Sequence, residues 1–140
     1  MRNGVAGLTI IPVALLVHNL EEAFTIAAAR PRLEALWSTL LGCPVALPSV
    51  HESHLALAVV TGLAFGVLVL ARFWEPASYA LVVLQAVMTV NVLTHVVGAL
   101  LLRGYAPGVV TALLVEAPTS AFVFRRVRAA GWMSPGRSEP

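Results

Sequence analysis

Apolar residues fill four long stretches of the chain, and short polar or proline-containing segments separate them. The pattern predicts helices at about residues 5–29, 49–73, 77–102 and 107–124. Each stretch is close to the roughly 20 residues that an α-helix needs to cross a hydrocarbon core of about 30 Å. We therefore expect an all-α integral membrane protein whose single domain, residues 1–130, is an up-down bundle of four transmembrane helices.

The connection between the first two stretches begins at Arg30-Pro31-Arg32, where we expect the first helix to stop. It carries a second, shorter apolar pattern at helical spacing: Leu33, Leu36, Trp37, Leu40 and Leu41. This pattern predicts a short interfacial helix anchored by Trp37, and a lid over a site is an alternative interpretation. After the fourth stretch, residues 131–140 are expected to form a disordered tail.

The composition excludes an ordinary soluble domain, because 59% of the residues are hydrophobic and only 11% are charged. Nine arginines and seven glutamates supply the net charge of +2. Most of the excess positive charge lies at the C-terminal end, which fits a basic rim at the membrane surface rather than nucleic-acid binding. Cys43 is the single cysteine, so a disulfide framework or a cysteine-rich metal site within one chain is excluded.

Arginine also predicts the orientation. With four spans, one face carries six arginines and the other carries three, Arg30, Arg32 and Arg103. The six are Arg2, Arg72, Arg125, Arg126, Arg128 and Arg137. Positive charge is enriched on the cytoplasmic side. We therefore expect a multi-pass protein of a bacterial-type inner membrane with both termini in the cytoplasm.

Three ionisable residues, His18, Glu21 and Glu22, interrupt the first apolar stretch. A charged side chain at the centre of a membrane helix costs about 2.5–3.5 kcal/mol. Spacings of three and four residues place all three side chains on one face of a helix. Ionisable groups inside a membrane usually mark a functional site; the alternative is a helix end whose charges reach water at the interface.

Each of the other stretches also contributes polar groups. At 1.5 Å per residue, their depths in an up-down bundle predict one layer in the half that faces away from the cytoplasm. The members of that layer are His18, Glu22, His54, Asn91, His95 and Glu116. His51 and Glu52 lie so close to the boundary that they are equally well explained as solvated residues, and Gln85 is interpreted as structural.

Imidazole and carboxylate groups are ligands for zinc, iron or manganese, and helix bundles hold such ions between facing helices. We interpret His18, Glu22, His54 and His95 as ligands of a divalent transition metal. Glu21, Glu22 or Glu116 then supplies an acid or base, with Asn91 in the catalytic site. The expected function is a membrane enzyme acting on a small lipophilic substrate, such as an isoprenoid or acyl compound, and a homo-oligomer is compatible with it.

The same residues allow two other interpretations. A carboxyl group buried among apolar side chains can stay protonated and act as an acid, with a histidine as base, which would suit a metal-free isomerase or cyclase. A non-catalytic transport subunit with a cation or proton site is the third possibility; with only four helices, it would be expected to oligomerise.

Three motifs lie in order along the chain: His18-Asn-Leu-Glu21-Glu22, then Asn91-x-x-x-His95, then Tyr105-Ala-Pro107-Gly108-Val-Val-Thr111. Together they resemble the bacterial HXXEE-motif membrane proteins, from the first stretch to the start of the fourth. The resemblance implies a small multi-spanning protein. It adds weight to His18, Glu21, Glu22, Asn91 and His95 as a set, and it names no reaction.

Overall fold

The computed structural model describes residues 7–131. Arg2, Arg137 and residues 132–140 of the expected tail lie outside the described residues. Within that range the chain is helical, with no strand, which confirms the predicted all-α class. The elements are α2 (Ile10–Leu41), α3 (Val50–Leu70), α4 (Pro76–Leu101), α5 (Val109–Thr111), the π-helix η1 (Ala112–Glu116) and α6 (Ala117–Ala129). The last three follow one another without a break, so the described chain forms four long helical segments.

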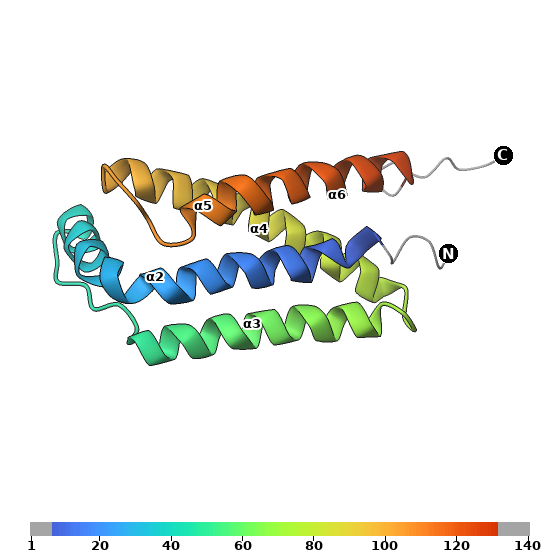
Figure 1. The fold of residues 1–140 in the computed structure, drawn as a ribbon, viewed down its shortest axis with the longest axis horizontal. Coiled ribbons are helices and arrows are strands. Elements are labelled where there is room, and N and C mark those ends of the chain that lie inside the picture. The colour runs from blue at the N-terminus through green and yellow to red at the C-terminus, as the bar shows by residue number, and fades with distance from the viewer. Residues whose placement is uncertain (1–6, 132–140) are drawn as a thin grey trace.

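The first helix is longer than predicted. We expected it to stop at Arg30-Pro31-Arg32 and a separate interfacial helix to follow, but α2 continues through Pro31 to Leu41. Arg30 Nε donates to Glu34 Oε1 over 3.0 Å, one turn later, which stabilises the helix across the proline. Figure 1 shows the last part of α2 turning away from its first part, as expected where proline removes a backbone hydrogen bond.

The helices pack side by side, and both described ends of the chain lie at the same end of the bundle (Figure 1). The main apolar core is at that end and consists of Leu8, Ile11, Leu68, Ala71, Ala77, Leu81, Val123 and Val127. Outward-facing positions also carry large apolar side chains, such as Leu63 and Leu114, which are 64% and 72% exposed. By length and composition, α2, α3 and α4 can each cross a membrane. These features indicate a membrane protein.

Helix α3 begins almost where predicted, because its first turn is capped. The Ser49 hydroxyl accepts a hydrogen bond from the Glu52 backbone N–H, and the Glu52 carboxylate accepts one from the Ser49 N–H. This reciprocal pair satisfies two backbone donors that a helix start leaves free. Glu52 therefore has a structural role at the start of α3, and His51 beside it is exposed.

The fourth segment begins after Gly108, whose φ of 76° lies in the left-handed region. It extends to Ala129, five residues beyond the predicted end at Phe124. The π-helical turn Ala112–Glu116 is wider than an α-helical turn, and such turns are frequent at functional sites. This turn ends at Glu116, whose side chain is only 1% exposed.

Candidate functional site

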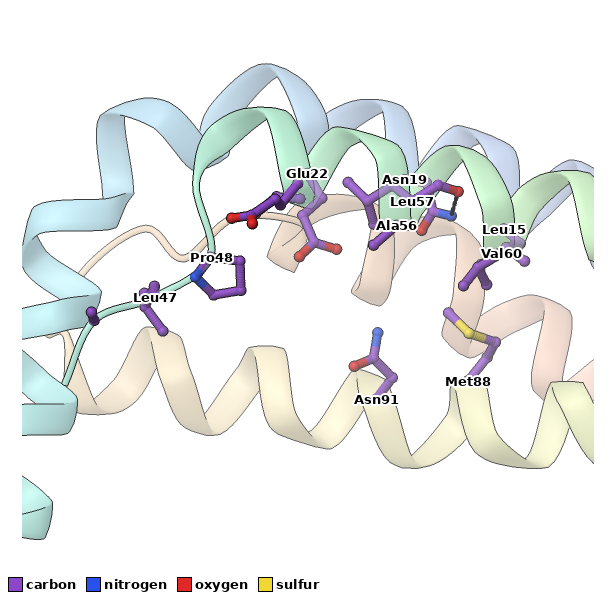
Figure 2. Close-up of a pocket in the computed structure, with 13 residues that line it drawn as sticks. Leu15, Asn19, Glu22, Leu47, Pro48, Ala56, Leu57, Val60, Met88 and Asn91 are labelled. Atoms are coloured by element: carbon purple, nitrogen blue, oxygen red, sulfur yellow. Dashed lines mark hydrogen bonds between the residues drawn. The ribbon is translucent and has the colours of Figure 1, made fainter.

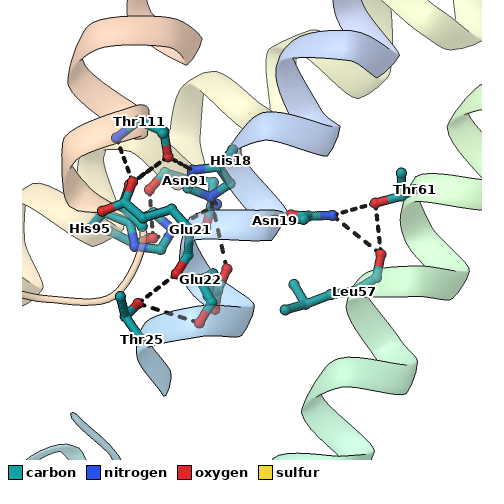
Figure 3. A network of polar contacts seen from close by, with 12 residues as sticks. His18, Asn19, Glu21, Glu22, Thr25, Leu57, Thr61, Asn91, His95 and Thr111 are labelled. Atoms are coloured by element: carbon teal, nitrogen blue, oxygen red, sulfur yellow. Dashed lines mark hydrogen bonds and ion pairs between the residues drawn. The ribbon is translucent and has the colours of Figure 1, made fainter. Parts of the chain in front are cut away.

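Two helices bring three potential metal ligands together. His18 and Glu22 lie one turn apart on α2, and His95 faces them from α4 (Figure 3). One ligand atom from each residue lies within 4.8 Å of the other two. His18 Nε2 is 3.9 Å from Glu22 Oε2, and the two imidazole rings meet edge to face with their centroids 4.7 Å apart. His18 is 1% exposed, so its imidazole depends on protein partners.

Asn91 lies between the two imidazoles. Its Nδ2 atom is 3.3 Å from His18 Nε2 and 3.0 Å from His95 Nε2. An amide nitrogen carries two hydrogens, so it can donate to both rings if both Nε2 atoms are unprotonated. An unprotonated Nε2 is also the form in which histidine binds a metal. The arrangement therefore favours neutral imidazoles that carry their proton on Nδ1.

The other nitrogen of His18 is held by a threonine. His18 Nδ1 is 3.1 Å from Thr111 Oγ1, which donates in turn to Glu21 Oε2 over 2.5 Å. A hydroxyl has one hydrogen, so the imidazole is the donor and the hydroxyl the acceptor in the first of these bonds. A chain that runs from imidazole to carboxylate in this way fixes the tautomer and orientation of metal-binding histidines. In this site it leaves His18 Nε2 facing Glu22 and His95.

Glu21 accepts hydrogen bonds at the start of the fourth segment. Its donors are the Tyr105 hydroxyl at 2.5 Å, the Val110 N–H at 3.3 Å, and both the N–H and the hydroxyl of Thr111 at 2.6 and 2.5 Å. The first backbone N–H groups of a helix have no partner within it and attract negative charge. Glu21 therefore connects α2 to the beginning of the last helical segment.

Tyr105 lies in the connection between α4 and α5. Burial of its phenol and the hydrogen bond to the Glu21 carboxylate raise the pKa of Tyr105 above its ordinary value. The hydroxyl therefore keeps its proton at neutral pH and remains a donor to Glu21.

Gly108 allows the connection to approach both imidazoles. A Cβ atom at this position would lie 2.8 Å from His18 Cε1 and 3.0 Å from His95 Cε1. Both separations are shorter than van der Waals contact, and the φ of 76° is one that glycine adopts without steric cost. Glycine is therefore required here for two independent reasons.

A cavity of about 870 Å³ adjoins the cluster. Figure 2 shows Glu22 and Asn91 on its wall, between α2, α3 and α4. Most of the other lining side chains are apolar: Leu15, Ala46, Leu47, Pro48, Ala56, Leu57, Val60 and Met88. The cavity can therefore hold an apolar molecule against polar groups of the cluster.

The expected single layer of polar groups is divided in the structure. His18, Glu21, Glu22, Asn91 and His95 come together, but His54 and Glu116 do not join them. His54 is exposed, and its Nε2 is 2.9 Å from the Ala23 carbonyl oxygen. Glu116 forms a separate buried group with Gln85 and Ser120. Depth along a helix does not specify the direction in which a side chain points, which explains the difference.

Sequence reasoning missed Tyr105, Gly108 and Thr111 as members of the site. They lie in a connection and at a helix start, where neither hydrophobic periodicity nor ionisable groups identify them. The available signal was the Tyr-x-Pro-Gly-x-x-Thr segment, which entered only as part of a family resemblance. Asn19, the second residue of the HXXEE pentad, binds Thr61 Oγ1 at 2.8 Å and so connects α2 to α3.

Comparison with known proteins agrees with the three motifs. Residues 9–123 match the family described as proteins of unknown function with an HXXEE motif. No curated protein and no solved structure matches the chain. The motif residues His18, Glu21 and Glu22 are those that the structure gathers with Asn91, His95 and Thr111. The chain therefore belongs to the HXXEE-motif family, as the sequence resemblance implied.

Proposed function

We propose that this protein is a membrane enzyme that binds one divalent transition metal ion through His18, Glu22 and His95. Its substrate is a small lipophilic molecule held in the adjoining cavity. One observation carries the proposal: Glu22 belongs both to the group of ligand atoms and to the wall of an otherwise mainly apolar cavity. An ion bound there would meet a substrate directly.

The ligand set fits zinc, iron or manganese. Metal–ligand bonds of about 2.0–2.2 Å place tetrahedral ligand atoms roughly 3.4 Å apart. The three atoms lie within 4.8 Å of one another, so side-chain movements of about an ångström bring them into range. Three protein ligands leave a coordination position open, as in catalytic sites, where the ion acts as a Lewis acid. Asn91 would turn its amide aside as the ion enters.

The other residues of the cluster position these ligands. Thr111 accepts a hydrogen bond from His18 Nδ1 and donates to Glu21, which holds the imidazole with Nε2 toward the ligand group. We expected Glu21 to act as a general acid or base. Four hydrogen bonds now favour a positioning role for Glu21. Glu22, whose carboxylate faces the cavity, is the better candidate for contact with substrate.

The membrane arrangement supports a lipophilic substrate. We propose that α2, α3, α4 and the continuous segment α5–η1–α6 cross a bacterial inner membrane in an up-down arrangement. The six-to-three arginine count favours cytoplasmic termini, which places the cluster in the outer half of the bilayer. Apolar molecules dissolved in the bilayer can then reach the cavity without passing through water.

A second candidate is a metal-free isomerase or cyclase that uses the same residues in acid–base chemistry. The position of Asn91 favours it, because the amide nitrogen is within 3.3 Å of both imidazoles and occupies the space between them. In that case Glu22 would donate a proton to the substrate and a histidine would accept one.

Metal analysis of Glu22→Gln distinguishes the two candidates. The metal proposal predicts that the wild-type protein, purified in detergent and incubated with zinc, manganese or iron, retains about one ion per chain. Glu22→Gln should insert normally and lose most of the metal, because an amide is a far weaker ligand than a carboxylate. His51→Gln is the matched control, since His51 is exposed at the start of α3. A wild-type protein that binds none of the three ions would contradict the metal proposal and favour the acid–base candidate.

A further inference from the structure

The bundle contains a second buried polar group, which the proposed function does not use. Glu116, at the end of η1, is 1% exposed, and Gln85 on α4 is fully buried beside it. We infer that Glu116 is a proton-binding site, which holds a proton at neutral pH and is separate from the histidine cluster. Gln85 is six residues from Asn91, so the two sites are about 9 Å apart along α4.

The hydrogen bonds around Glu116 do not satisfy every oxygen of this buried group. Gln85 Nε2 donates to Glu116 Oε2 over 3.2 Å and to Ser120 Oγ over 2.8 Å, which uses both of its hydrogens. The Thr89 hydroxyl lies 2.9 Å from Ser120 Oγ and 2.8 Å from the backbone carbonyl oxygen of Gln85. Among the described residues, two buried oxygens, Glu116 Oε1 and Gln85 Oε1, have no hydrogen-bond partner.

Within residues 7–131, Glu116 also has no counter-charge. The ion pairs within residues 7–131 are His18–Glu22 and Arg30–Glu34, and neither includes Glu116. The elements packed against η1 also carry basic side chains: His18, Arg30 and Arg32 on α2, His95 on α4, and Arg125, Arg126 and Arg128 on α6. None of these forms an ion pair with Glu116 in the described part of the chain. The nearby acidic groups Glu21 and Glu22 belong to the first cluster.

A buried carboxylate without a counter-charge costs several kcal/mol, and such groups become neutral instead. A proton on Oε1 removes the charge and converts an unpartnered acceptor into a donor. Gln85 Oε1, the other unpartnered oxygen, is an acceptor from the residue that already binds Glu116 Oε2. One proton therefore removes the buried charge and gives the Glu116 carboxyl group a donor. A sodium ion would instead need several oxygen ligands, while Gln85 presents its nitrogen to the carboxyl group.

Infrared spectroscopy of the full chain in lipid nanodiscs tests the inference directly. At neutral pH the wild-type protein should show the carbonyl stretch of a protonated carboxylic acid, and this band should shift in heavy water. Glu116→Gln should abolish it and leave zinc binding unchanged, because Glu116 is not among the ligands. Glu75→Gln, at an exposed position that caps no helix through its side chain, should retain it.

A second variant covers the case in which Glu116→Gln fails to fold. Gln85→Leu removes the donor to Glu116 Oε2, so the band should persist and move to higher frequency as its carbonyl loses a hydrogen bond. Absence of the band from the wild-type protein, or a band of unchanged intensity in Glu116→Gln, would overturn the inference. A wild-type melting temperature that rises with sodium chloride but not with choline chloride, and no longer does so in Glu116→Gln, would overturn it in favour of a sodium site. In the metal-free candidate Glu22 would also be protonated, so Glu22→Gln separates the two sites: it should keep the Glu116 band whether or not His18, Glu22 and His95 bind metal.

Discussion

The two polar clusters of the bundle accommodate carboxyl groups in opposite ways. Glu21 is surrounded by donors from Tyr105, Val110 and Thr111, and its neighbour Glu22 faces a cavity. Glu116 has one amide donor, no ion-pair partner within the described chain and one unpartnered oxygen. The first arrangement stabilises the negative charge of Glu21 and leaves the Glu22 carboxyl group to face a ligand. The second stabilises only a neutral acid, so burial alone does not specify what a buried glutamate does.

Gly108→Ala should have the largest effect, and it should alter the histidine cluster while leaving the Glu116 group intact. The new methyl group would lie within 3.0 Å of carbon atoms of both His18 and His95, so at least one imidazole must shift. We expect loss of zinc binding and a clear fall in melting temperature, with the infrared band of Glu116 unchanged. Zinc content and thermal unfolding measure the two parts of the effect.

Gly42→Ala is the matched control for that substitution. Gly42 also has a positive φ, 67°, but a Cβ atom there meets nothing within 4 Å. Both variants therefore incur the left-handed backbone cost of roughly 1–2 kcal/mol, and only Gly108→Ala adds a clash at the site. Equal zinc affinity in the two variants would show that the close approach of Gly108 does not shape the cluster.

Thr111→Val should have the next largest effect. It removes the hydroxyl between His18 and Glu21 while keeping a β-branched shape, so the imidazole loses the partner that fixes its tautomer. Loss of such an outer partner typically lowers metal affinity about 10–100-fold. Competition with a zinc chelator measures the change, and Thr111→Ser, which keeps the hydroxyl, should stay near the wild-type affinity. If Thr111→Val and Thr111→Ser bind zinc with the same affinity, Thr111 contributes only packing.

Tyr105→Phe is expected to have the smallest effect, about 1 kcal/mol or less, because Tyr105 is 41% exposed. The raised pKa of Tyr105 means that the folded protein keeps this proton after the unfolded chain has lost it. That contribution to stability is complete below the unfolded pKa and is lost as pH rises through the folded one. Melting temperature should therefore fall more steeply above about pH 10 in the wild-type protein than in Tyr105→Phe.

Sequence patterns predicted the helices well where local chemistry fixes their starts. The Ser49–Glu52 capping pair and Pro76 place the starts of α3 and α4 within a residue of the expected positions. At Pro31 the expectation failed, since the Arg30–Glu34 pair supports a helix that proline alone would end. Local sequence identifies a helix breaker, but a contact one turn away decides whether the helix continues.

The candidate site was predictable only in part, for a geometric reason. Spacings of four residues place His18 with Glu22 and Asn91 with His95, and the structure brings both pairs together. Depth estimates also grouped His54 and Glu116 with them, because depth contains no information about direction around the helix axis. Tyr105 and Thr111 reach Glu21 across 84 and 90 residues, a separation at which no local pattern reports contact.

That long separation also has a consequence for the timing of biosynthesis. The ribosome adds about 5–20 residues per second, so Thr111 follows Glu21 by roughly 5–20 seconds. During that interval the Glu21 carboxylate has none of the donors that surround it in the finished protein. The nascent first helix must therefore keep Glu21 hydrated or protonated until residues 105–111 emerge. The site can therefore be completed only after residues 105–111 have been synthesised, and a chain that stops before Tyr105 cannot assemble it.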